Sequence, residues 1–390
     1  MQPDHPNSAC AARHLPSASP VAPIKGDREP GTWTPEHIIQ AWPADRPLAA
    51  ARRSRDGAWL FALPEQTLRI SGPLDAPACQ WLDPAGEPVQ RSPEPSCSTA
   101  GVFEPAVRTP LASHKPATPS RPAWPLAEIH RCEHAWLLTP AGSLEPIGKP
   151  PPLARDAQSA IAPEPRLAFV SAMGREAYTQ AVEQALGSIV RGEVYELNLA
   201  HHLVAPRETV AAADGRAHDR RLVAALIHAA DPACGMVLER WGEHPMALAS
   251  ASPEIFLTFD AATRTLTARP MKGTRAAGAQ GRAQLEASSK ERAELAMITD
   301  LMRNDLGRVC EIGSVRVARA RAIEQHASGD LLQAVSVVQG TLPAHVSLLN
   351  ALPHLLPAGS ITGAPKVQAV KRIAQLEPES RGMWCGNGLL

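Results

Sequence analysis

The sequence lacks an excess of charge of either sign, because its 39 basic and 39 acidic residues balance and its isoelectric point is near 7.2. Proteins that bind nucleic acid or anionic membrane surfaces by electrostatics carry a basic excess, so the balance argues against both partners. The chain also lacks a run of about 18 apolar residues that could span a bilayer. Residues Met1–Pro6 contain no apolar core of a signal peptide. We therefore expect a soluble cytoplasmic protein.

The cysteines lack the spacing of a metal site. The chain has seven of them, an odd number, and no pair has the Cys-x-x-Cys spacing. This arrangement supports neither a zinc cluster nor a disulfide framework. We expect buried or inert thiols in a reducing compartment.

Proline and tryptophan are unevenly distributed along the chain. Of the 39 prolines, 29 lie within residues 1–165, where they prevent long helices and inner strands. Six of the eight tryptophans lie in the same region, which is more apolar area than a disordered segment carries. We therefore predict a proline- and alanine-rich, divergent N-terminal region (1–165) of short strands and turns, followed by a second domain (166–390).

The second domain has the periodicities of both helices and strands. Alanines four residues apart predict a helix over residues 174–191, with Ser171 as its cap. Further helices are predicted over residues 284–302 and from about residue 364. Strands are predicted at residues 193–204, 235–239, 246–259 and 263–268. Helices and strands mix without strict alternation, so patterning alone predicts a mixed α and β fold.

Two segments place an ionisable side chain at a turn. In the first, Lys272 ends a predicted strand at a glycine turn, so a rigid strand would aim its amine as a nucleophile. The alternative is a surface lysine in a basic turn. In the second, Ser252-Pro253 presents Glu254, which could keep its proton near neutral pH and act as a general acid if shielded from water. The alternative is an exposed turn glutamate.

Two further segments could bind ions. Glu291 and Glu294 are three residues apart on a predicted helix and project from one face, an arrangement that suits Mg²⁺. The alternative is a solvated charged face. The loop from Gly359 to Lys366 has two glycines before a helix, which predicts an anion site at Thr362 and Gly363. The alternative is an ordinary capped loop. It is not a Walker A loop, because Val367 follows the lysine where Ser or Thr is required.

Taken in order, these segments form a specific set. They are Gly192–Ala200, Ser252–Glu254, Pro270–Thr274, Glu291–Glu294, Arg303–Val309 and Gly359–Lys366. Together they closely resemble the chorismate-utilising enzymes, a family that includes anthranilate, aminodeoxychorismate, isochorismate and salicylate synthases. The resemblance covers about residues 170–390 and is vague before that, around Phe103–Arg108. It implies an α+β fold in which two β-sheets pack face to face with helices outside.

The resemblance also implies a reaction. Aminodeoxychorismate synthases carry lysine at the position of Lys272, where anthranilate synthases have alanine. The implied mechanism has Lys272 add to the chorismate ring while Glu254 assists departure of the hydroxyl. Ammonia from a glutamine amidotransferase subunit then attacks and the lysine leaves, giving 4-amino-4-deoxychorismate on the folate and para-aminobenzoate pathway. A glutamate at Glu196 argues against isochorismate synthase, because hydroxylating relatives place a lysine base there.

The same resemblance assigns the binding residues. It makes Glu294 a Mg²⁺ ligand and Glu291 a second, water-mediated one. It gives substrate contacts to Gly273, Thr274, Thr362 and Gly363. A dianionic substrate such as chorismate needs a metal and hydrogen-bond donors in a shielded site, so the assignment is chemically consistent.

The sequence departs from the family in two places. Gln333 stands where the family often has histidine, and an amide cannot exchange a proton. The family also continues well beyond Gly386, with an arginine for a substrate carboxylate and a further metal-binding glutamate. Each lost partner of a buried charge costs about 2–5 kcal/mol, so two losses predict a rate at least ~10³-fold lower. We therefore expect a fold incomplete at its C-terminal end and a weak or inactive chain.

Two alternatives remain open. The first is anthranilate synthase component I, which Lys272 disfavours and which the position of the product's amino group would distinguish. The second is a non-catalytic truncated remnant, which would make no product.

Overall fold

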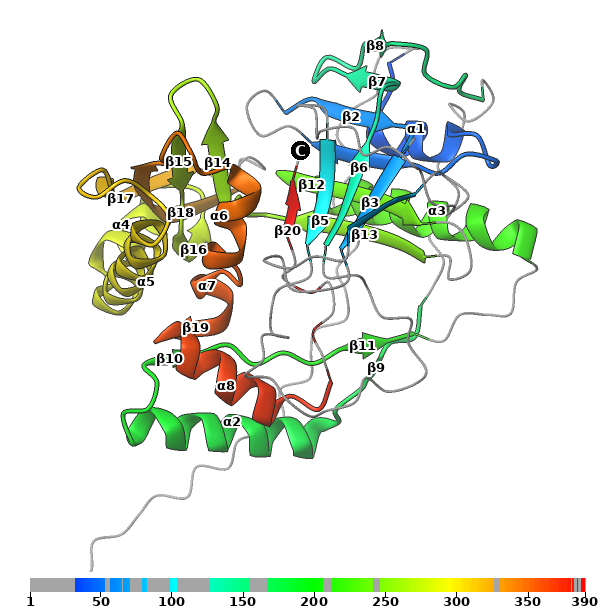
Figure 1. Cartoon of the computed structure of the whole chain (residues 1–390). Coiled ribbons are helices and arrows are strands. Elements are labelled where there is room, and N and C mark those ends of the chain that lie inside the picture. The colour runs from blue at the N-terminus through cyan, green and yellow to red at the C-terminus, as the bar shows by residue number, and fades with distance from the viewer. Residues whose placement is uncertain are drawn as a thin grey trace, which may run out of the picture. The chain divides into compact units, whose positions relative to one another are not determined.

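A computed structural model describes residues 32–52, 57–64, 66–70, 79–82, 99–103, 127–154, 167–205, 212–240, 246–325, 330–379, 381, 384 and 387–389 (Figure 1). The chain divides into Met1–Thr32 and Trp33–Leu390, and all elements below belong to the second unit. Residues 104–108 of the vague family match lie outside the described residues.

The first sheet has six antiparallel strands. Their order is β13 (Met246–Ser252), β12 (Cys234–Arg240), β1 (Ala49–Arg52), β2 (Trp59–Ala62), β7 (Ala135–Leu138) and β8 (Leu144–Ile147). Helices α1 (Pro35–Ala41) and α3 (Ala212–Ala230) contact each other, and their apolar faces join Phe61 and Val237 in one buried cluster. This sheet combines strands from both sides of residue 165, where we predicted a domain boundary; that boundary stays a prediction.

A second sheet has five antiparallel strands, and it too combines distant segments. Their order is β20 (Asn387–Leu389), β5 (Thr99–Phe103), β6 (Ala127–Arg131), β3 (Gln66–Ile70) and β4 (Cys79–Leu82). The last strand of the chain therefore pairs with a strand of the N-terminal region.

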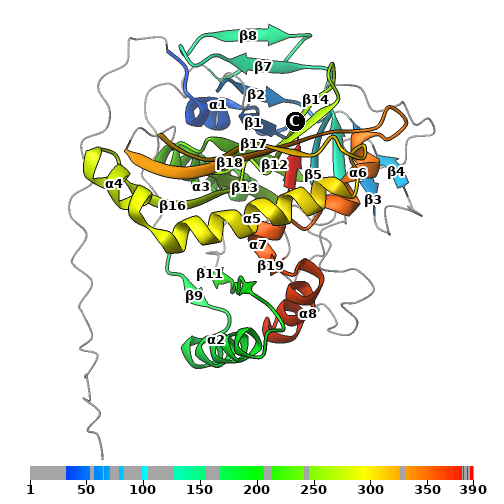
Figure 2. The ribbon, with the colours of Figure 1, turned by 90° about the vertical axis from the view of Figure 1, so that its left-hand side faces the viewer.

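The third sheet carries the segments that the sequence singled out. It contains β14 (Leu257–Asp260), β15 (Thr265–Ala268), β18 (Leu331–Thr341) and β16 (Met271–Ala276), and β17 (Arg316–Gln325) also pairs with β18. Helix α5 (Ser289–Gly307) runs across it between α4 (Ala279–Ala287) and α6 (Leu348–Leu355) (Figure 2). Leu266, Ile298 and Val338 are fully buried where α5 packs on this sheet.

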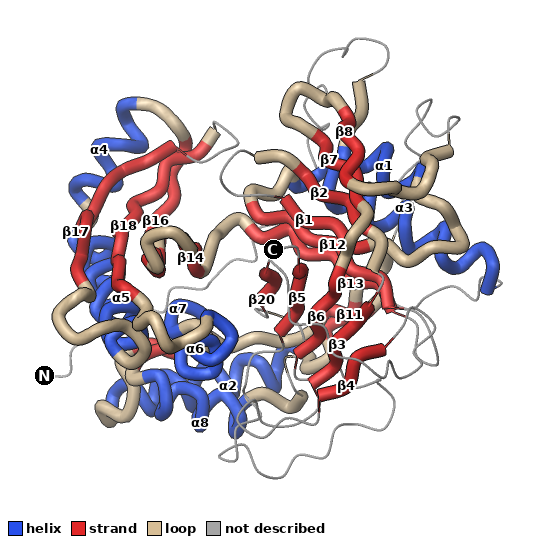
Figure 3. Tube along the Cα trace, turned by 45° about the horizontal axis from the view of Figure 1, so that its top comes forward, coloured by secondary structure: helices blue, strands red, loops and turns tan. Residues whose placement is uncertain are grey.

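Short elements link the sheets. Strand β9 (Val170–Ser171) pairs with β11 (Leu203–Val204), and β10 (Glu196–Leu197) pairs with β19 (Gly363–Ala364). Helices α2 (Arg175–Val190) and α8 (Lys366–Leu376) lie close to each other (Figure 3), and α7 (Gly359–Thr362) precedes β19. The α+β prediction is confirmed, because helices accompany sheets that are antiparallel throughout the described strands.

Several element predictions need correction. Helix α2 forms as predicted, but Gly174 is its N-cap and the Ser171 hydroxyl instead accepts the Gly174 N–H at 3.1 Å. The strand predicted over residues 246–259 is two strands, β13 and β14. The helix predicted over residues 284–302 is two helices, because Ser288 caps α5 by accepting the Glu291 N–H. Among the described helices, none combines the length and apolarity that crossing a bilayer requires.

Candidate active site

Lys272 lies at the second position of β16, and its amine contacts a carboxylate. The Lys272 Nζ atom donates to Glu196 Oε1 at 3.0 Å, and the two side chains are 24% and 20% exposed. The lysine was predicted to end a strand, which is wrong, because the strand continues to Ala276 on the far side of Gly273. Lys272 is in register with Ala334 of β18, which fixes its backbone in the sheet; the predicted role of its amine as a nucleophile stays a prediction.

Gly273 lies at an irregularity in strand β16, at the position where the sequence predicts a glycine turn. The register of β16 against β18 shifts between Lys272 and Thr274, and Gly273 has φ of +77°, which favours glycine. A Cβ atom at this position would lie 2.8 Å from the Glu291 carboxyl. The glycine therefore lets the strand that bears Lys272 approach helix α5 at Glu291. Thr274 follows in register with Gln333.

Glu254 lies near the same lysine. Burial raises the pKa of Glu254 to about 7, while a hydrogen bond from the Met271 backbone and the charge of Lys272 lower it. The Ser252 hydroxyl fixes the turn, because it donates to the Glu254 carbonyl at 2.9 Å and accepts the Glu254 N–H at 3.3 Å. A carboxyl with this pKa is partly protonated at neutral pH, which is what a general acid requires.

The segment predicted as a loop is instead the short helix α7 followed by strand β19, and their junction, called here the Thr362–Gly363 loop, reaches the site through β10. Glu196 and Ala364 are in register, and the Asn198 N–H donates to the Thr362 carbonyl at 3.0 Å. Gly363 has φ of +138°, and a Cβ there would lie 2.1 Å from the Glu196 carbonyl oxygen. Thr362 itself is fully buried, and its hydroxyl donates to the Ala358 carbonyl at 3.1 Å. The predicted substrate role of this loop stays a prediction.

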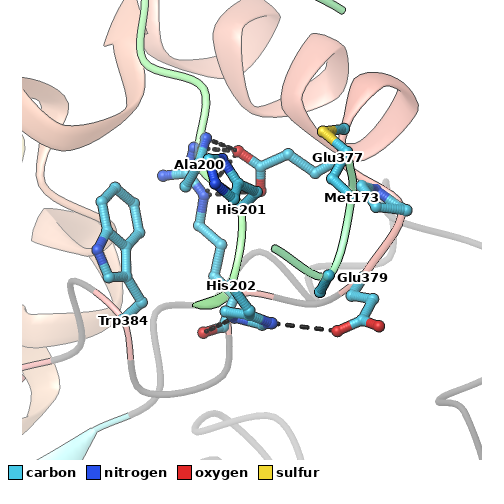
Figure 4. A pocket seen from close by; sticks show the side chains of 10 residues that line it. Met173, Ala200, His201, His202, Glu377, Glu379 and Trp384 are labelled. Carbon is cyan, nitrogen blue, oxygen red and sulfur yellow. Dashed lines mark hydrogen bonds and ion pairs between the residues drawn. The ribbon is translucent and has the colours of Figure 1, made fainter. Parts of the chain in front are cut away.

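A buried arginine joins the backbone just after β10 to the backbone of α7. Arg381 pairs with Glu377 at 2.6 Å and donates to the carbonyls of Asn198 at 2.7 Å and Ile361 at 2.9 Å. Its guanidinium also lies 4.7 Å from the centre of the Trp384 ring. Arg381, Glu377 and Trp384 line a small open pocket together with the His202–Glu379 pair (Figure 4). None of the predicted site residues lines this pocket.

Lys366 supports the loop instead of facing a ligand. Its amine pairs with Asp305 Oδ1 at 2.7 Å and donates to the Leu355 carbonyl at 3.1 Å. Burial lowers the pKa of Lys366 and raises the pKa of Asp305. The pair therefore joins the end of α5 to the start of α8.

The two predicted metal ligands differ in environment. Glu291 Oε1 pairs with Arg275 at 2.9 Å, whereas its Oε2 atom is buried and has no hydrogen-bond partner among the described residues. Glu294 is about one-third exposed and lies 3.7 Å from Lys290. In the part of the chain that the structure describes, no three carboxylate, histidine or cysteine side chains form a metal cluster. Two carboxylates fit Mg²⁺ nonetheless, because Mg²⁺ keeps several waters and takes further ligands from an anionic substrate.

The structure therefore brings together Lys272, Glu254, Gly273 and Glu291, and the Thr362–Gly363 loop joins them through Glu196. Sequence reasoning missed three partners, namely Glu196 for Lys272, Arg275 for Glu291 and Asp305 for Lys366. Arg275 alone had a local signal, because it lies on the same strand as Lys272.

A comparison with known families identifies this arrangement. The pattern of the chorismate binding enzyme family matches residues 127–389, which is more than half of the chain. The chain belongs to the chorismate binding enzymes. The predicted resemblance is thereby confirmed, and the match begins earlier than predicted, within the N-terminal region.

Curated members of the family match the same part of the chain. An anthranilate synthase component 1 from Thermus thermophilus is 35% identical over 228 residues, which cover 57% of this chain and 46% of that protein. An aminodeoxychorismate synthase component 1 from Klebsiella aerogenes is 38% identical over 221 residues, which cover 55% and 46%. The matches thus span about half the length of these relatives.

Solved structures of the family share the fold. Anthranilate synthase component I from Streptococcus pneumoniae superposes with a TM-score of 0.58 at 18% identity, covering 87% of this chain and 79% of that one. A menaquinone-specific isochorismate synthase from Escherichia coli gives a TM-score of 0.57 at 17% identity, covering 90% and 78%. Identities this low support the fold alone.

Proposed function

We propose that this chain carries the site of an aminodeoxychorismate synthase component I, which converts chorismate and ammonia to 4-amino-4-deoxychorismate. The observation that carries the proposal is the Lys272 amine, which pairs with Glu196 on a strand that approaches α5 at Glu291 and is close enough to Glu254 for its charge to lower the pKa of that carboxyl. The name of the relative from Klebsiella aerogenes supports it. The alternative, anthranilate synthase component I, has a similarly close relative but lacks a use for the lysine.

The chain's own residues supply two steps. In the first, the Lys272 ammonium loses a proton to solvent and the free amine bonds to the chorismate ring. The ring's carbon–oxygen bond breaks, and Glu254 gives its proton to the departing hydroxyl, which leaves as water. The nitrogen, now bonded to the ring, returns a proton to the Glu254 carboxylate. In the second, ammonia bonds to the ring and the bond to Lys272 breaks, which returns the lysine. Ammonia is supplied by a glutamine amidotransferase partner.

Substrate binding uses the residues around these two groups. Gly273, Thr274 and the Thr362–Gly363 loop position the ring, and Glu291 and Glu294 would hold Mg²⁺. Bound Mg²⁺ would offset the negative charge of a substrate carboxylate. The partnerless Glu291 Oε2 atom is the feature that fits this assignment.

The test is a product assay with chorismate, Mg²⁺ and ammonium ions. The wild-type chain is expected to form 4-amino-4-deoxychorismate, and Lys272→Ala is expected to lower the rate at least ~10³-fold, as loss of a nucleophile does. Lys371→Ala, on the exposed side of α8, is the matched control and retains the wild-type rate. Equal product from Lys272→Ala would remove the covalent role, and anthranilate as product would establish the alternative. Absence of product from the wild-type chain would reject the proposal for this chain.

A further inference from the structure

We propose that Glu196 is a positioning residue for Lys272, which fixes the amine against the β10–β19 pair. Naming the lysine a nucleophile rests on the proposed function, whereas the positioning itself rests on contacts alone. No sequence pattern joins the two residues, because they are 76 positions apart.

The first argument is the freedom of the lysine side chain. A lysine amine sits on a flexible four-carbon stem, so a strand fixes its Cα atom but not its nitrogen. Among the described residues, the hydrogen bond from Lys272 Nζ goes to Glu196 Oε1. The carboxylate is therefore what determines where the amine lies.

The second argument is that Glu196 is itself held. The Tyr195 N–H donates to the Ala364 carbonyl at 2.7 Å, and Glu196 is in register with that residue. Arg381 holds the backbone on both sides of this pair, through Asn198 and Ile361. The backbone of Glu196 is thus fixed to the segment that is proposed to bind substrate, and its carboxylate links the Lys272 amine to that segment.

The third argument is the state of the carboxylate. Glu196 Oε2 is buried and, within the described chain, has no hydrogen-bond partner. The oxygen of Glu196 that has a partner is the one that accepts from Lys272 Nζ, so the contact this carboxylate makes within the described chain is with the lysine amine.

The experiment measures how fast an amine-reactive acetylating reagent modifies each lysine, using the full-length chain and peptide mass spectrometry. No turnover is required, so the result is independent of the proposed function. The readout is the rate at Lys272 divided by the rate at Lys290, which is 84% exposed in the same molecule. Lys366, which is 11% exposed, stays unmodified while the chain is folded and so reports folding within the same sample.

Glu196→Ala is expected to raise this ratio about three- to fivefold, the range that loss of a partly exposed ion pair allows. Glu196→Gln keeps the size of the side chain and an acceptor oxygen, so it is expected to raise the ratio by less. Glu193→Gln is the matched control, because Glu193 is three residues earlier but pairs with Arg191 and Arg372. It leaves the ratio unchanged.

A ratio in both Glu196 variants equal to that of Glu193→Gln would overturn the proposal. If Lys366 becomes modified in Glu196→Ala, the alanine variant has unfolded and the glutamine variant decides. Turnover gives a second readout, since loss of positioning lowers kcat of Glu196→Gln while KM for chorismate stays within about twofold. A rise in KM alone would assign Glu196 to substrate binding and overturn the positioning role.

Discussion

Two lysine–carboxylate pairs lie close to Thr362 and Gly363 in the chain's fold, and they differ in how deeply they are buried. Lys366 and Asp305 are 11% and 3% exposed, and Lys366 also donates to a backbone carbonyl. Lys272 and Glu196 are 24% and 20% exposed. In each pair one carboxylate oxygen, Asp305 Oδ2 or Glu196 Oε2, has no hydrogen-bond partner among the described residues. The first pair joins α5 to α8, whereas the second keeps its amine partly exposed.

The difference shows that the same pair of charges can serve two purposes. A buried pair cannot change partners without leaving a charge alone in the protein interior, so it supports structure. A partly exposed pair loses less when its partner changes. Of the two lysines, Lys272 therefore fits the proposed nucleophile better.

The largest expected effect breaks the structural pair. Asp305→Ala leaves the Lys366 charge buried without a partner and is expected to lower the free energy of unfolding by about 3–5 kcal/mol. Glu196→Gln, at the partly exposed Lys272–Glu196 pair, is expected to change the free energy of unfolding by at most about 1 kcal/mol. Urea denaturation measures both values.

A double variant checks the cause of the first effect. Asp305→Leu combined with Lys366→Met removes both charges and is expected to recover most of the stability that Asp305→Ala loses. Equal losses for Asp305→Ala and Glu196→Gln would contradict the contrast between the two pairs.

The next effect tests the contact between the loop and β10. Gly363→Ala introduces a Cβ atom 2.1 Å from the Glu196 carbonyl oxygen at a positive φ, and is expected to cost about 1–3 kcal/mol of stability. Gly307→Ala is the control, because no atom lies within 4 Å of the added Cβ at this helix end and the change is expected to add about 0.4–1 kcal/mol. Thermal unfolding of the two variants compares them, and a Gly363→Ala variant as stable as wild type would rule out the close approach.

The third effect is the pH dependence of turnover. A general acid must carry its proton, and the pKa of Glu254 is about 7. Relative to Glu254→Gln, which cannot donate this proton, the rate of product formation is therefore expected to be constant below this pH and to fall about tenfold per unit above it, because ionisation of the Lys272 amine affects both proteins alike and cancels in the ratio. Initial rates measured across this range should lose the break in Glu254→Gln and keep it in Glu193→Gln, because Arg191 and Arg372 hold the pKa of Glu193 at about 2. A break that persists in Glu254→Gln would assign the proton to another group.

The smallest effect concerns the exposed charges of α5. Lys290→Ala removes an (i, i+4) pair with Glu294 and is expected to change the free energy of unfolding by about 0.3–0.5 kcal/mol. A large loss of stability in urea would show that the α5 surface is not an ordinary solvated face.

Local patterns predicted the elements and the chemical groups, and failed for partners that are distant in sequence. The alanine spacing of α2 and the motifs around Lys272 and Glu254 lie within short stretches, so the sequence reveals them. The break between α4 and α5 also had a signal, because Ser288 and Glu291 have the spacing of a capping box. We predicted one helix because the apolar period continues across the break.

The contacts of Lys272 and Lys366 could not be predicted in this way. Glu196 and Asp305 meet them only after strands and helices have packed, and one sequence contains no record of which distant carboxylate a lysine will meet. The irregularity of β16 at Gly273 could be predicted in part. The glycine predicted a turn, but it did not predict that the strand continues beyond it.

The most direct measurement is peptide mass spectrometry of the wild-type chain after incubation with chorismate and Mg²⁺ in the absence of ammonia. The account predicts an adduct with the mass of chorismate less one water, located on Lys272 and lost on addition of ammonium ions. Product formation without any adduct, or an adduct on another lysine, would contradict it.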